Sequence, residues 1–140
     1  AHFEDKYDLV YKTAHRDFSR LLTDSVSDHS HLNEDAIRSI DSAIGEFLNM
    51  VFGDCHLQRQ LSSIVESAIH DALLKHITEW LDSLDKIRLD PKSIEIVAVT
   101  VSSALVGARL FNMRKGLKIS ESDNRLSVVD ILSNGLSGVA

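Results

Sequence analysis

An apolar residue recurs every three or four positions from Ile64 to Leu81. This period is typical of an α-helix and differs from the two-residue period of a half-buried β-strand. The stripe is wide and comprises Ile64, Val65, Ala68, Ile69, Ala72, Leu73, His76, Ile77, Trp80 and Leu81. A helix that is apolar around so much of its circumference is expected at the centre of a helical domain.

Helix-start signals place further helices around this one. Asp5, Asn33 and Asp90 are capping residues ahead of periodic segments, and Pro91 suits the first helical position. The predicted helices run from Asp5 to about Thr23, from Asn33 to Gly53, through 54–61, from Ser63 to Leu84, from Asp90 to a turn at Gly116, and from Ser120 onward. We therefore predict one all-α domain, residues 1–140, folded as an antiparallel bundle of five to six helices.

Two segments leave the secondary structure open. Ser63 and Glu66 have capping-box spacing, so the central helix either breaks there or continues; a bend is favoured. The β-branched segment "SIEIVAVTV" could form a strand. Pro91 and a hydrophobic staple of Leu89 with Ile94 favour a helix.

Composition restricts the function. The formal net charge is −6, which gives the chain no overall basic surface for nucleic acid. Cys55 is the only cysteine, so a disulfide within the chain is impossible and a cytoplasmic location is expected. The most apolar segment contains Glu95 and Arg109, which favours a buried helix over a membrane span.

Catalytic and metal-binding patterns are weak. His29 and His31 alternate in "DHSH", and Asp54, Cys55 and His56 are adjacent, but neither group supplies a recognisable zinc ligand set. No Ser occupies a Gly-flanked nucleophile elbow. We expect no enzyme activity, metal or cofactor.

Aromatic and polar residues on the helical stripes are candidates for a small-molecule site. His76 is the most informative, because a polar group within an apolar stripe either bonds to a neighbour in the core or lines a ligand cavity. The candidate ligand-binding residues are Phe18, Phe47, Met50, His76 and Trp80. Packing in the core is the alternative for all five.

Both ends of the chain resemble TetR-family transcriptional regulators. The opening "HFEDKYDL" is similar to the junction between the family's DNA-binding headpiece and its regulatory domain. The segment "SSALVGARLFNMRKGLKISESDNRLSVVDILSNGL" is similar to the last two helices of a TetR subgroup, which build a dimeric four-helix bundle. The resemblance implies a ligand-binding and dimerisation domain whose helix-turn-helix headpiece precedes Ala1.

The resemblance also implies roles for particular residues. Gly107 lies within a helix, where it costs about 1 kcal/mol relative to Ala, and would permit close approach of a second helix. The expected dimer interface comprises Ser102, Val106, Gly107, Leu110, Met113, Val129, Leu132 and Leu136. In the intact dimer, His2 and Lys6 would contact DNA phosphates. A stand-alone helical protein-interaction module without a ligand is the alternative function.

Overall fold

The computed structural model describes residues 3–31, 33–52, 59–84, 89–115 and 128–136. These residues form five α-helices and no β-strand: α1 (Phe3–Val26), α2 (Glu34–Phe52), α3 (Arg59–Ser83), α4 (Pro91–Lys115) and α5 (Val128–Leu136). The all-α prediction is confirmed.

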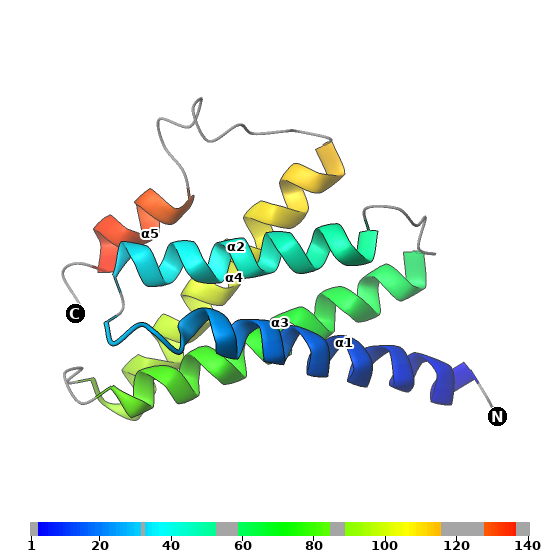
Figure 1. Cartoon of the computed structure of the whole chain (residues 1–140), viewed down its shortest axis with the longest axis horizontal. Helices are drawn as coiled ribbons and strands as arrows, with labels where there is room; N and C mark the ends of the chain where they lie inside the picture. The colour runs from blue at the N-terminus through cyan, green and yellow to red at the C-terminus, as the bar shows by residue number, and fades with distance from the viewer. Residues whose placement is uncertain (1–2, 32, 53–58, 85–88, 116–127, 137–140) are drawn as a thin grey trace.

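Each helix runs opposite to the one before it, which is the expected antiparallel arrangement (Figure 1). The most extensive packing joins α1 to α3, which lie alongside each other in the same direction; α2 covers α1 from one side. Helix α4 crosses behind α2 and packs on α3, and α5 rests on α2 and α4. The last two helices thus close one side of the bundle.

All five helices contribute to one apolar core. The largest side chains that are fully buried come from four of them: Phe18, Leu22, Ile37, Ile40, Ile44, Ile69, Leu73, Ile77, Leu81, Val101, Leu105 and Val106. The stripe of α3 supplies the centre of this core, as its period indicates. Burial of these side chains is the main force that holds the helices together.

Local capping explains where two helices begin. The Asn33 side-chain oxygen accepts a hydrogen bond from the Ala36 backbone N–H at 3.0 Å. Asp90 accepts one from the Ser93 backbone N–H at 2.7 Å, with Pro91 at the first helical position. Each cap satisfies a donor that the first turn of a helix leaves without an intrahelical partner.

Three predicted boundaries are wrong. Helix α1 begins at Phe3, so Asp5 lies within the helix and does not cap it. Helix α1 continues past Thr23 to Val26, and the hydroxyls of Thr23 and Ser25 bond back to the carbonyls of Ser19 and Leu21. These bonds replace the turn-forming contacts expected of a Ser-rich segment. The predicted bend at Ser63 is absent, because α3 runs without interruption from Arg59. Ser63 is exposed, so its hydroxyl needs no capping partner.

The β-branched segment of α4 is helical, as Pro91 indicates. By length and composition, the stretch Pro91–Asn112 is apolar enough to cross a membrane, and 39% of its most apolar part is buried within the chain. Of the short helix predicted for 54–61, residues 59–61 belong to α3, and 54–58 lie outside the described residues. The predicted turn at Gly116 and helix start at Ser120 lie outside them as well.

Candidate functional site

The five predicted ligand-binding residues occupy different environments. Phe18 and Phe47 pack against each other in the core, with ring centroids 5.3 Å apart and planes inclined at 49°. Met50 points outward and is 69% exposed. His76 and Trp80 are partly buried at the edge of α3. The structure therefore does not bring the five side chains together around one cavity.

Trp80 has a structural contact that the sequence did not predict. Its indole Nε1–H donates to the backbone carbonyl of His29 at 3.3 Å, and the His29 ring lies 3.0 Å from the Ser39 hydroxyl. These two bonds tie the turn after α1 to α3 and α2. His29 therefore anchors that turn through its ring and its backbone carbonyl.

His76 lines a groove between α1 and α3. The groove has a volume of about 550 Å³ and is lined by His15, Arg16, Ser19, Arg20, Thr23, Asp24, Lys75 and His76. Partial burial lowers the pKa of His76, while Glu79 opposes this and Lys75 and His15 add to it. Basic side chains thus predominate in a groove that two parallel helices form.

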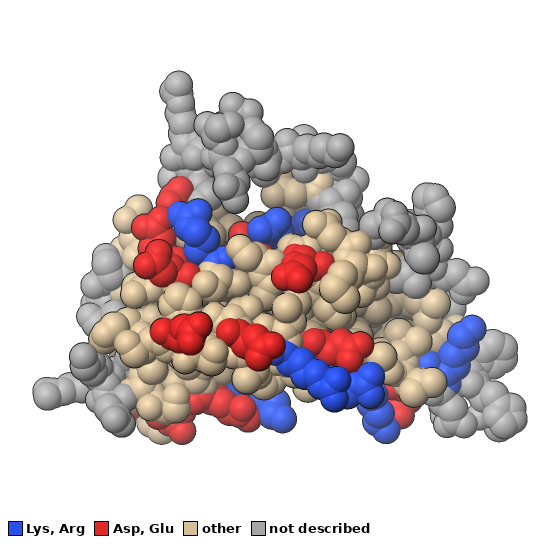
Figure 2. Space-filling model, in the orientation of Figure 1, with Lys and Arg blue, Asp and Glu red and all other residues tan. Residues whose placement is uncertain are grey.

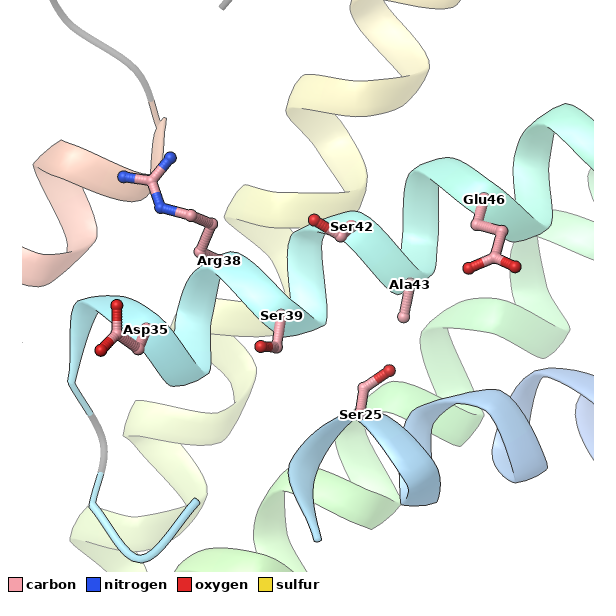
Figure 3. A pocket seen from close by; sticks show the side chains of 7 residues that line it. All are labelled: Ser25, Asp35, Arg38, Ser39, Ser42, Ala43 and Glu46. Atoms are coloured by element: carbon pink, nitrogen blue, oxygen red, sulfur yellow. The ribbon is translucent and has the colours of Figure 1, made fainter. Parts of the chain in front are cut away.

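A second groove lies between the end of α1 and α2, as Figure 3 shows. Its volume is about 430 Å³, and it is lined by Ser25, Asp35, Arg38, Ser39, Ser42, Ala43 and Glu46. Ser25 of α1 faces Ser39 and Ala43 of α2 (Figure 3). Short hydroxyls and two carboxylates give this surface a polar, acidic character unlike that of the first groove.

Helices α1 and α3 are also joined near the N-terminal part of α1. The Tyr11 hydroxyl donates a hydrogen bond to the Asp71 carboxylate. This bond, with partial burial and the charge of Asp71, raises the pKa of Tyr11 to about 12. The contact links α1 to α3 beyond the core.

One side of α4 is exposed along much of its length in the described part of the chain. Its exposed positions recur every three or four residues, at Lys92, Ile96, Val99, Thr100, Ser103, Gly107 and Phe111. Ile96 is 60% and Phe111 56% exposed, and Ile131 on α5 is 55% exposed. A Cβ added at Gly107 would meet nothing within 4 Å. Apolar side chains alternate on this side of α4 with polar ones, Glu95 included, and Gly107 adds no side-chain bulk.

The predicted dimer residues divide between this face and the core. Gly107 is on the exposed face, as the close-approach argument requires. The others that the structure describes are enclosed by the chain's own helices, which corrects their assignment: Ser102, Val106, Leu110, Val129, Leu132 and Leu136. The reason is that α2 and α3 pack on the side of α4 that the sequence pattern left for a partner.

The remaining predicted residues are partly described. Lys6 is exposed on the first turns of α1, while His2 and the side chain of Met113 lie outside the described part of the chain. Within the described ranges, no group of three or more His, Cys, Asp or Glu side chains is arranged to hold a metal ion. Cys55 and His56 lie outside these ranges.

The chain matches no family model, no curated protein and no solved structure. The fold and surface of the described residues therefore define its class: an all-α bundle with exposed apolar side chains on α4 and polar grooves beside α1.

Proposed function

We propose that the chain is the regulatory domain of a TetR-like transcriptional regulator. It forms a homodimer, binds a small apolar effector and controls DNA binding by a helix-turn-helix headpiece in the intact protein. The observation that carries this proposal is the exposure of three apolar side chains on α4, Ile96, Val99 and Phe111, with Gly107 among them. The family resemblance of the two chain ends supplies the biological context.

The dimer interface in this proposal is the side of α4 that carries Ile96, Val99, Gly107 and Phe111, together with the exposed Ile131 of α5. A face of this composition is an aggregation liability on a monomer. Pairing about a two-fold axis would bury the same residues of both copies. Gly107 would let the two α4 backbones approach closely, which a larger side chain would prevent.

The effector acts, in this proposal, through α1. Phe18 and Phe47 fill the space between α1 and α2, so an apolar molecule that enters there must favour a conformation in which α1 has shifted. A ligand changes an equilibrium only when it binds one conformation better than the other. Since the resemblance implies that α1 connects to the headpiece, such a shift would change the spacing of the two headpieces. Lys6, and His2 ahead of it, would contact DNA phosphates there.

Analytical ultracentrifugation of the chain tests the dimer. We expect a dimer at micromolar concentration, and we expect Val99→Glu and Phe111→Glu to give folded monomers. Leu9→Glu is the matched control, because Leu9 is 65% exposed but lies on α1; this variant should remain dimeric. A monomeric wild-type chain would contradict the proposal and favour the interaction module.

Hydrogen exchange tests the proposed effect of the effector on α1. An apolar probe that occupies the core between Phe18 and Phe47 should change hydrogen exchange along α1 and leave α5 unchanged. Protection that changes equally in both helices would contradict a movement confined to α1.

A further inference from the structure

The groove between α1 and α3 concentrates positive charge in a protein whose net charge is −6. Arg16 and Arg20 are one turn apart on α1, and Lys75 approaches from α3. Figure 2 shows Lys and Arg side chains along the lower edge of the molecule over α1, with Asp and Glu side chains between and above them. The positive charge of the groove is opposite in sign to the net charge of the chain. It therefore does not follow from the overall composition.

The acidic side chains nearby do not neutralise these groups. Arg16 contacts Asp17 at 3.2 Å, in an exposed pair that stabilises little. Asp24 lines one end of the groove. Neither Arg20 nor Lys75 forms an ion pair with a described residue. Two cationic groups on facing helices are therefore available to a ligand.

Ser19 supplies an independent observation. Ser19 lines this groove, and its buried hydroxyl oxygen has no hydrogen-bond partner among the described residues. A buried polar group without a partner is costly, and such groups commonly mark a missing water, ion or ligand. The backbone carbonyl of Ser19 already accepts a hydrogen bond from the Thr23 hydroxyl. The group of Ser19 that lacks a partner is therefore its side-chain hydroxyl.

We propose that the groove between α1 and α3 binds a small phosphate-bearing molecule through Arg16, Arg20 and Lys75, with the Ser19 hydroxyl donating to a phosphate oxygen. A phosphate monoester has three strong acceptor oxygens and nearly two negative charges. Guanidinium groups bind such oxygens with two parallel hydrogen bonds. His15 and His76 complete the lining and can donate ring N–H groups.

Phosphate fits this set of hydrogen-bond donors better than a carboxylate or a nucleic acid does. A carboxylate has two oxygens and one charge, which is fewer acceptors than the cationic and hydroxyl groups from the two helices can engage. A nucleic acid requires an extended basic surface, and the net charge of −6 opposes it. The groove volume of about 550 Å³ is in the range of small-molecule sites.

This inference does not depend on the proposed regulatory function. The groove residues lie on α1 and α3, whereas the dimer face lies on α4 and α5. Phosphate binding by a monomeric chain would support the groove and contradict the dimer. A dimer that does not bind phosphate would support the dimer and contradict the groove proposal.

Isothermal titration calorimetry with inorganic phosphate, methyl phosphate and acetate tests the proposal. We expect one saturable site for both phosphates and at least about tenfold weaker binding of acetate. Arg20→Gln and Lys75→Gln should each weaken phosphate binding about tenfold, since each removes a charge-assisted bond. Arg38→Gln is the matched control, because Arg38 lines the acidic groove instead; it should leave binding unchanged.

Ser19→Ala separates ligand binding from stability. Without ligand this variant should be at least as stable as wild type, because it removes an unpaired buried hydroxyl, yet it should bind phosphate several-fold more weakly. Lack of saturable phosphate binding by the wild-type chain would overturn the proposal. So would equal binding of acetate, or phosphate affinity that Arg20→Gln and Lys75→Gln leave intact.

Discussion

Arg109 of α4 donates two hydrogen bonds to the Asp41 carboxylate of α2. One runs from Nε to Oδ1 at 2.9 Å and the other from a terminal guanidinium nitrogen to Oδ2 at 2.7 Å. The Asp41 side chain is 15% exposed, so this is the least solvated ion pair among those of the described residues. Gly45, one turn further along α2, lies against the same guanidinium: a Cβ there would come within 2.8 Å of it. The glycine thus makes room for the link between α2 and α4.

We predict that Gly45→Ala and Arg109→Met are energetically coupled. With Arg109 replaced, alanine should stabilise the helix by up to about 1 kcal/mol through its higher helix propensity. With Arg109 present, the new methyl group displaces the guanidinium, and this gain should be lost or reversed. A double-mutant cycle of urea unfolding measures the coupling, which we expect to be about 1–2 kcal/mol. Gly135→Ala, where a Cβ meets nothing, is the control; additive effects at Gly45 and Arg109 would contradict the close contact.

We predict that Tyr11 ionises at a higher pH than an unperturbed tyrosine and that its contribution to stability is lost in alkali. The neutral phenol donates to Asp71, which raises its pKa from 10.0 to about 12. Because the pKa is higher in the folded chain, the stabilisation is complete below pH 10 and disappears as the pH rises from 10 to 12. The difference in phenolate absorbance between wild type and Tyr11→Phe should show a midpoint near 12. A midpoint near 10 would mean that the bond does not persist in solution.

We predict that the cap of α4 weakens in acid. Hydrogen bonds from the Ser93 backbone and then from its side chain lower the pKa of Asp90 below 3.8. The carboxylate therefore contributes stability above that pH, and the contribution is lost as the pH falls through the folded-state value. Asp90→Asn keeps a capping side chain without the charge. Its urea midpoint should fall less than that of wild type between pH 5 and pH 2, and an equal fall would exclude Asp90 as a source of acid sensitivity.

We predict that Ser102→Ala stabilises the chain. Ser102 is buried in α4, and its hydroxyl has no partner among the described residues. Its removal should raise the free energy of unfolding by about 1 kcal/mol, from higher helix propensity and the loss of an unpaired polar group. Ser103→Ala, on the exposed face of α4, should give only the propensity gain of about 0.5 kcal/mol. If Ser102→Ala destabilises, the hydroxyl has a partner that the described residues do not include.

The helix starts at Asn33 and Asp90 could be predicted because capping is local. In each case one side chain reaches a backbone N–H three residues ahead, and no distant residue is needed. The break expected at Ser63 failed for a related reason. A capping pattern can stop a helix, but continuous packing of the α3 stripe on α1 and α4 favours an unbroken helix over the local alternative.

The sequence alone determined that this chain is helical, because the period of its apolar residues and its capping residues depend on near neighbours only. It also indicated that the most apolar segment forms a buried helix. Only the tertiary structure decided which side of that helix α2 and α3 cover, so that Val106 faces the core and Val99 faces outward. The basic groove likewise could not be predicted. Arg20 and Lys75 are far apart in the chain, and they share a groove only because α1 and α3 pack in parallel with these positions side by side.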